Sequence, residues 1–396
     1  MNLTLQNGFG KLSENQRMLI KILACVVFIK LSLFLMAFVL TGAVSHEAQK
    51  PRSLLSLSVM YRTLEHVVYL SDSAWYQQIA QDGYTKAPFS AQQQQNWAFF
   101  PVWPALLKVG MVAGFDHIVW AAMLSFLFSM GFSIYLYLLF RLDFSESVSL
   151  CAVLLINLFP SAYFFFRSGT EALFLFCISS SIYYARKGGW TAASLAGAVG
   201  ALSRFQGIFV LLPLFVILLR QYLKEGFKPS YVLIGIVPAA VASFFLYLYL
   251  ITGNYFAAVD IQVCWGNTFD GLFTSYLSQI REAKFVGFWG WDLSVVTLLV
   301  LTFCLLALLT SLFLWKKGIY PVEYLIYTLP NVLLLFTKAS LLSSVRYIGM
   351  IFPLMLIPVL VTENRPALRQ MIFFFSTALL MLLFLSAVLG YQWATA

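Results

Sequence analysis

The stretch MLIKILACVVFIKLSLFLMAFVLTGAV, residues 18–44, decides the class of fold. It is apolar over about 25 residues, which is long enough for a helix to cross the roughly 30 Å hydrocarbon core of a bilayer. The apolar core of a signal peptide has only about 7–15 residues. We therefore expect residues 18–43 to form an uncleaved first membrane span.

The composition of the whole chain agrees with a membrane protein. Of its 396 residues, 61% are hydrophobic and 10% are charged, whereas a soluble globular protein carries about 25% charged residues. The formal net charge is +9, but Lys and Arg fall in short gaps between apolar segments. That pattern is typical of cytoplasmic loops held against anionic headgroups and argues against a nucleic-acid partner. The five cysteines have no metal-ligand spacing and predict neither a disulfide framework nor a zinc site.

Apolar segments of similar character follow the first along the chain. They lie at 118–140, 148–166, 170–185, 190–203, 205–219, 231–251, 292–315, 320–337, 347–361 and 370–390. With 18–43 they predict one all-α, polytopic membrane domain over residues 1–396, of about eleven transmembrane helices. Two polar and aromatic stretches, 44–96 and 253–290, are too long to be turns.

The basic residues of the short loops predict the orientation. They fall on one side of the membrane if segment 97–116, NWAFFPVWPALLKVGMVAGF, does not cross it. Pro101, Pro104 and Lys108 favour a short helix on the outer interface for that segment. The basic residues concerned are Arg141, Arg186, Lys187, Arg220, Lys224, Lys228, Lys316, Lys317, Arg365 and Arg369. Residues 44–116 and 253–290 then form two outer loops, the first with interfacial amphipathic helices, on the extracytoplasmic or lumenal side.

On this topology the outer side collects ionisable residues, several of them at helix ends. They are Asp72, Asp82, Arg167, Glu171, Arg204, Asp260, Asp270, Lys338 and Arg346. Ionisable groups drawn toward hydrocarbon cost a few kcal/mol, so such a cluster indicates a site.

Three of these residues also have structural interpretations. Asp72 could cap a helix that begins beside it. Glu171 could pair with Arg167 or Arg204 to hold two helix ends together. Arg346 could be an interfacial residue that snorkels to the headgroups.

Several short motifs occur in order between about residues 72 and 353 and carry a resemblance to a known family. They are Asp72-x-x-Trp75-Tyr76-x-x-Ile79-Ala80-x-x-Gly83-Tyr84, Phe99-Phe100-Pro101-x-x-Pro104, Phe159-Pro160-Ser161-Ala162, Thr170-Glu171-Ala172-Leu173-Phe174, Ser203-Arg204-x-x-Gly207, Gln262-x-x-Trp265-Gly266 and Val345-Arg346-Tyr347 before Phe352-Pro353. This arrangement resembles the PIG-V family of GT-C-type membrane mannosyltransferases, which use a lipid-phosphate-linked sugar. The chain departs from that family at Ser71, where Trp is usual, and at Gly169-Thr170-Glu171, where Tyr-Ser-Glu or Tyr-Thr-Glu is common. These departures leave the sugar and the acceptor open.

The resemblance implies an inverting sugar transfer, and this reaction requires particular chemical groups. A base must take the acceptor proton, and cations or hydrogen-bond donors must stabilise the leaving phosphate. The implied general base is Asp72, and the implied donor-phosphate ligands are Arg346 and Arg204. The implied substrate contacts are Trp75, Tyr76, Glu171, Gln262, Trp265 and Tyr347. The expected substrates are a polyprenyl- or dolichyl-phosphate sugar and a glycolipid or glycan acceptor, with no cofactor and no metal ion.

Two other classes of function remain open at this stage. A transporter or flippase for a lipid-linked or amphipathic solute would explain the many spans, but it should hold its ionisable residues near the bilayer midplane. A non-catalytic subunit could retain the same fold. The compact loops and short chain favour a bacterial plasma membrane over the endoplasmic reticulum.

Overall fold

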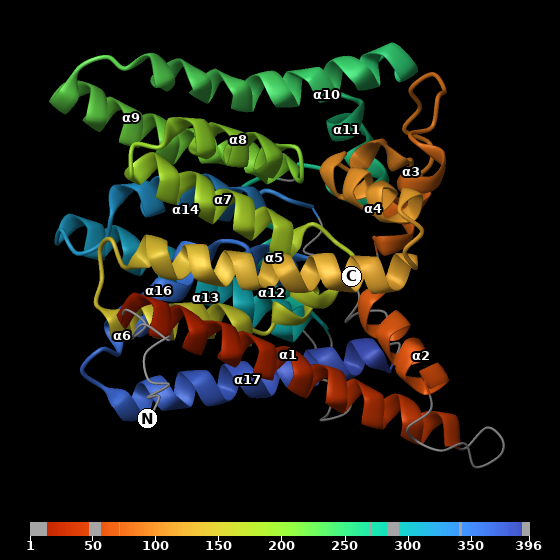
Figure 1. The fold of residues 1–396 in the computed structure, drawn as a ribbon, viewed down its shortest axis with the longest axis horizontal. Coiled ribbons are helices and arrows are strands. Elements are labelled where there is room, and N and C mark those ends of the chain that lie inside the picture. The colour runs from red at the N-terminus through yellow and green to blue at the C-terminus, as the bar shows by residue number, and fades with distance from the viewer. Residues whose placement is uncertain are drawn as a thin grey trace, which may run out of the picture.

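A computed structural model describes residues 14–46, 57–70, 72–269, 271–282, 293–339 and 343–389. Within these ranges the regular secondary structure is helical, apart from an isolated antiparallel bridge between Phe269 and Lys338, and loops join the helices (Figure 1). The prediction of an all-α fold is therefore confirmed for this part of the chain. Ser71 and Asp270, which the sequence analysis singled out, lie outside the described residues.

The α-helices are α1 (Glu14–His46), α2 (Leu57–Val68), α3 (Ser73–Asp82), α4 (Val102–Val112), α5 (His117–Phe140), α6 (Glu146–Leu158), α7 (Glu171–Arg186), α8 (Trp190–Ala201), α9 (Leu211–Glu225), α10 (Ile236–Thr252), α11 (Ala257–Asp260), α12 (Thr274–Glu282), α13 (Leu293–Lys316), α14 (Val322–Phe336), α15 (Ser344–Gly349), α16 (Leu356–Val361) and α17 (Pro366–Val388). Short 3₁₀ helices are η1 (Asn96–Ala98), η2 (Ala162–Phe166), η3 (Phe205–Val210), η4 (Pro229–Gly235), η5 (Ile261–Trp265) and η6 (Phe352–Met355).

Six helical segments of the described chain are long and apolar enough to cross a bilayer. They are Gln16–Thr41, His117–Phe140, Phe205–Glu225, Pro229–Thr252, Thr297–Lys316 and Pro366–Val388. The protein is therefore an integral membrane protein. The larger number of about eleven crossings remains a prediction.

Prolines break two of the predicted spans. The segment 148–166 divides at Pro160 into α6 and η2. The segment 347–361 is interrupted just before Pro353, between α15 and η6, and η6 continues directly into α16. Proline removes a helical hydrogen bond and clashes with the preceding turn. Because both breaks lie inside the bundle, they place irregular backbone and helix ends in the protein interior, where lipid does not reach them.

The helices run roughly alongside one another, and their connections gather at two opposite ends (Figure 1). One end holds the connections between α5 and α6, α7 and α8, α9 and α10, α13 and α14, and α16 and α17. These connections carry the basic residues that the charge pattern assigns to one side. An ion pair between Arg186 and Asp143, at 2.7 Å, joins two of them. Which end faces the cytoplasm remains a prediction.

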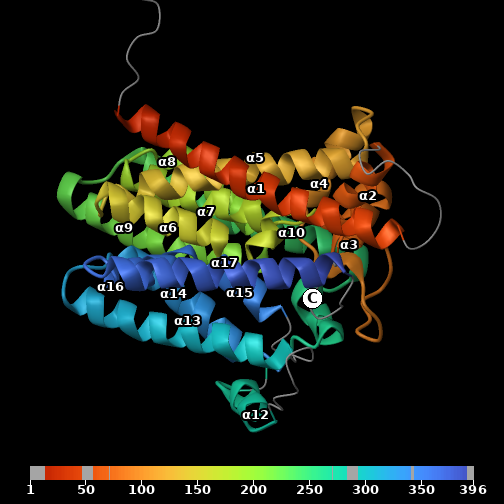
Figure 2. The same cartoon turned by 90° about the horizontal axis from the view of Figure 1, so that it is seen from below.

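The opposite end carries α2, α3, α4 and α11, which come from the two predicted outer loops (Figures 1 and 2). Helix α4 has 11 residues and is about 17 Å long, so it is too short to cross the hydrocarbon core. The two loops contact each other, because the Cys264 thiol donates to the Ala91 carbonyl at 3.2 Å and the Gln94 side chain donates to the Cys264 carbonyl at 3.3 Å. Residues 47–56 and 283–290 of these loops lie outside the described residues.

Asp116 caps the start of α5 and links it to the first outer loop. Asp116 Oδ1 accepts hydrogen bonds from the Ile118 and Val119 amides, each at 3.0 Å, and Oδ2 accepts from the Tyr61 hydroxyl at 2.9 Å. Loss of such a helix cap costs about 1 kcal/mol. We expect Asp116→Ala to lower the free energy of unfolding in mixed micelles by about that amount. Asp116→Asn should retain most of the stability, since Asn caps equally well; equal losses in both variants would contradict this role.

Candidate active site

Asp72 lies at the entrance of α3, and its side chain points away from that helix. The residue occupies the N-cap position, yet its side chain caps no backbone amide. The neighbouring Ser73 anchors the start of α3 instead, since its hydroxyl donates to the Leu70 and Ser168 carbonyls at 2.8 and 2.9 Å. Asp72 Oδ2 accepts from Arg346 Nη1 at 2.5 Å. The interpretation of this side chain as a helix cap is therefore wrong.

Arg346 connects Asp72 to a second, deeply buried carboxylate. Its Nε donates to Glu171 Oε1, the same oxygen that accepts from Arg204 Nη1 at 2.6 Å. Arg204 also donates to the Thr170 hydroxyl at 2.9 Å. Glu171 is only 1% exposed and both arginines are buried, so each charge depends on its partners. The structural interpretation of Glu171 as a partner of Arg204 is confirmed, and Arg346 is buried and paired rather than snorkelling.

Two glycines permit this convergence of segments. A Cβ atom on Gly207 would lie 2.3 Å from the Gly200 carbonyl oxygen, and one on Gly349 would lie 2.2 Å from the Ser161 hydroxyl. Because the neighbour of Gly207 is backbone, any larger residue there would push η3 away from the end of α8, whereas at Gly349 the Ser161 side chain would have to turn aside. Because Arg204 precedes η3 and Arg346 lies in α15, these close approaches position both guanidinium groups.

The cluster borders a cavity of about 430 Å³. Its wall includes the predicted site residues Asp72, Trp75, Tyr76, Arg204, Gln262, Trp265, Arg346 and Tyr347, together with Gln94, Phe99, Ser203, Phe205, Gln206, Asn267 and Ser343. Glu171 does not line the cavity, because it lies behind the two arginines. Its predicted contact with substrate is therefore not favoured by the geometry, which instead suits a residue that positions the arginines.

Aromatic rings from both outer loops form one wall of this cavity. Trp75 stacks on Phe99, with ring centroids 5.7 Å apart and planes 16° apart. Trp265 presents an edge to both rings, with centroids 5.5 and 5.4 Å away. The Trp265 indole N–H is buried without an acceptor among the described residues. A wall of this kind offers apolar ring surface to a ligand.

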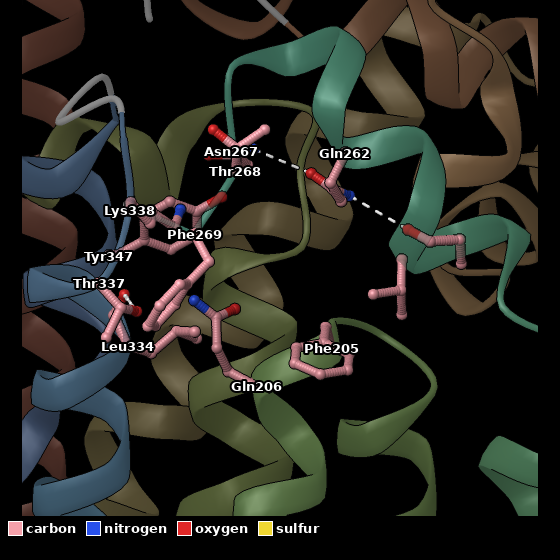
Figure 3. A pocket seen from close by; sticks show the side chains of 12 residues that line it. Phe205, Gln206, Gln262, Asn267, Thr268, Phe269, Leu334, Thr337, Lys338 and Tyr347 are labelled. Atoms are coloured by element: carbon pink, nitrogen blue, oxygen red, sulfur yellow. Dashed lines mark hydrogen bonds between the residues drawn. The ribbon is translucent and has the colours of Figure 1, made fainter. Parts of the chain in front are cut away.

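A second cavity of about 230 Å³ adjoins the first (Figure 3). The two share Phe205, Gln206, Gln262, Asn267 and Tyr347, and the second is also lined by Ala258, Val259, Thr268, Phe269, Leu334, Thr337 and Lys338. The Gln262 side chain accepts from Asn267 at 2.9 Å, which ties the shared wall together (Figure 3).

Lys338 is the cation among the described residues that line this second cavity. The sequence analysis placed it in the outer cluster of ionisable residues without a specific role. Its Nζ lies 4.0 Å from the centre of the Tyr347 ring, and the Arg204 guanidinium carbon lies 5.1 Å from the same ring. The bridge to Phe269 and the hydrogen bond from the Ala339 amide to the Thr268 carbonyl, at 2.8 Å, hold its backbone. Burial lowers the pKa of Lys338, and the contact with Tyr347 opposes that shift. Its only signal in the sequence is a lysine directly after the apolar segment 320–337.

Comparisons with known proteins establish no family for this chain. A scan against protein-family models and a search of curated proteins find no match. Among solved structures, the chain is similar to the apo form of an oligosaccharyltransferase from Archaeoglobus fulgidus, with 13% sequence identity and a TM-score of 0.46, over 91% of this chain and 55% of that one. The chain thus spans about half the length of that protein. A likeness this distant establishes no family, so the resemblance to the PIG-V family stays a prediction and the function has to be argued from the site.

Proposed function

We propose that the protein is a membrane glycosyltransferase that moves mannose from a polyprenyl- or dolichyl-phosphate donor to a glycolipid or glycan acceptor, with inversion. The observation that carries this proposal is the first cavity, in which the Asp72 carboxylate and the guanidinium groups of Arg204 and Arg346 border one space beside an aromatic wall. Such a set combines a proton acceptor, cations for a phosphate and a surface for a sugar ring.

The chemistry would be a direct displacement at the anomeric carbon. The acceptor hydroxyl attacks that carbon and gives its proton to Asp72, while the bond from the anomeric carbon to the phosphate oxygen breaks and leaves its electron pair on the lipid phosphate. Charge grows on the departing phosphate, where Arg204 and Arg346 would stabilise it. Glu171 would hold the two guanidinium groups in place, because both donate to its Oε1.

The ion pair with Arg346 is compatible with Asp72 as a base. Arg346 binds Oδ2, and 25% of the Asp72 side chain remains exposed, so the carboxylate can still meet an acceptor hydroxyl in the cavity. The pairing also fixes the orientation of the carboxylate, which general-base catalysis requires.

The position of the cavity supports a transferase over a transporter. Its residues come from α3, η5 and α15 and from the segment before η3, close to the end of the bundle that carries α2, α3, α4 and α11 (Figure 1). A transporter of lipid-linked solutes should instead hold its ionisable residues near the midplane. In this proposal that end of the bundle faces the extracytoplasmic or lumenal side.

Incubation of the purified protein in lipid nanodiscs with radiolabelled undecaprenyl-phosphate mannose and a panel of glycolipid and glycan acceptors tests the proposal. We expect label to move into an acceptor in a form resistant to the mild acid that cleaves the donor. Absence of transfer from mannose, glucose and arabinose donors, together with movement of the donor between leaflets of proteoliposomes, would favour a flippase and contradict the proposal.

A further inference from the structure

The second cavity is lined by both polar and apolar side chains. Figure 3 shows Lys338 and Tyr347 on the same side as Phe269 and Leu334, and Phe205 on the other side. The remaining side chains divide into an apolar set and a polar set. The apolar set is Ala258, Val259, Phe269 and Leu334, and the polar set is Gln206, Gln262, Asn267, Thr268 and Thr337. A ligand that fills this space should therefore have one anionic or polar end and one apolar end.

The apolar part of this cavity lies where membrane helices end. Phe205 begins the candidate span Phe205–Glu225, and Leu334 lies in α14. Phe205, Val259 and Phe269 are 43%, 39% and 80% exposed. Exposed apolar side chains at the end of a membrane helix can contact lipid tails, so the cavity is placed to receive a lipid chain from the bilayer.

Within the described part of the chain, Lys338 has no carboxylate as an ion-pair partner. The buried ion pairs join Arg346 to Asp72 and Glu171, and Arg204 to Glu171. None of the ion pairs found among the described residues includes Lys338. Among the described residues that line the two cavities or form these ion pairs, three cations face two carboxylates, which leaves one net positive charge. Since a charge removed from water needs a partner, this excess indicates an anionic ligand.

We propose that the second cavity binds the lipid phosphate and the first prenyl units of the donor, with Lys338 as the main phosphate-binding cation. This inference rests on the proposed function and names the part of the donor that each cavity holds. The phosphate lies where the cavities meet, between Lys338 and Arg204, which both contact the Tyr347 ring. The sugar then extends into the first cavity toward Asp72. Arg346, already held by Asp72 and Glu171, contributes less to donor binding than the sequence analysis implied.

Binding of farnesyl phosphate to the protein in nanodiscs, measured by titration without any acceptor, tests this site. We expect farnesol and inorganic phosphate each to bind at least about tenfold more weakly than farnesyl phosphate, because each lacks one half of the ligand. Lys338→Gln should weaken farnesyl phosphate binding by about tenfold or more, and Lys338→Arg should retain most of it. Lys108→Gln, which changes a lysine of α4 that lines neither cavity, is the matched control and should leave binding unchanged.

A second variant tests whether blocking the second cavity weakens binding when its charges are unchanged. Val259→Trp should fill the apolar part without altering a cation and weaken farnesyl phosphate binding to a similar extent. Val263→Trp, an exposed position four residues on that lines neither of these cavities, should not. Thermal unfolding of each variant shows whether it is folded.

The outcomes distinguish the two proposals. Unchanged farnesyl phosphate affinity in folded Lys338→Gln and Val259→Trp variants overturns the second-cavity site, even if the wild-type protein transfers sugar. Lys338-dependent binding in a protein that transfers no sugar supports this site and overturns the proposed function.

Discussion

Asp72→Asn should lower the rate of sugar transfer by about 10²–10⁴-fold, which is the usual contribution of a positioned general base. The amide keeps the size of the side chain and an oxygen that can accept from Arg346, but it cannot take the acceptor proton. The affinity for farnesyl phosphate should change little, because Asp72 does not line the second cavity. Single-turnover transfer of labelled mannose and the farnesyl phosphate titration measure the two effects separately.

A matched control for this substitution lies at the other end of the same helix. Asp82 is the last residue of α3 and is exposed, so Asp82→Asn removes the same charge from the same element away from both cavities. Its transfer rate should equal that of the wild-type protein. A transfer rate in Asp72→Asn close to that of Asp82→Asn would contradict the role of Asp72 as the base.

Glu171→Gln should lower the free energy of unfolding by about 3–5 kcal/mol, the usual cost of removing one partner from a buried ion pair. The substitution leaves the guanidinium groups of Arg204 and Arg346 buried beside a neutral amide. Denaturation of the purified protein in mixed micelles measures the loss. If enough folded protein remains, its transfer rate should also fall, because a neutral amide oxygen orients the two arginines less firmly than the carboxylate does.

The exposed pair between Glu225 and Lys228, at 2.6 Å, provides the comparison for Glu171. Exposed pairs contribute little because water and salt screen them. Glu225→Gln should therefore leave the unfolding transition unchanged. A transition in Glu171→Gln that also matches the wild-type protein would show that Glu171 is not the acceptor that holds the two arginines.

Much of the fold could be predicted because lipid restricts what the backbone can do. Within the hydrocarbon core, each backbone amide and carbonyl group must be paired inside the segment, so a long apolar run such as 18–43 predicts a helix. The structure gives α1 and α17 close to the predicted bounds. The sequence analysis did not predict the helix breaks near Pro160 and Pro353. An apolar run shows that a segment is shielded from water, but it does not show where the helix within that segment ends.

The candidate site was predictable where its residues bear charge at the ends of apolar segments. Asp72, Arg204 and Arg346 meet that description, and the structure brings them to one cavity. The shared use of one Glu171 oxygen by two arginines could not be predicted, because it depends on how α7, α15 and η3 pack. Lys338 was predicted to belong to the outer cluster of ionisable residues, but not to line a cavity of its own. That position depends on the bridge to Phe269 and on the contact with Tyr347, which join segments that no local pattern relates.

The most direct test is a cryo-EM structure of the Asp72→Asn protein in nanodiscs with polyprenyl-phosphate mannose bound. We predict that the donor phosphate lies within about 4 Å of the side-chain nitrogens of Lys338 and Arg204, the usual range of an ion pair. The anomeric carbon should face residue 72, and the first prenyl units should contact Phe205 and Val259. A donor phosphate bound at the opposite end of the bundle, near Arg186 or Lys316, would contradict the account.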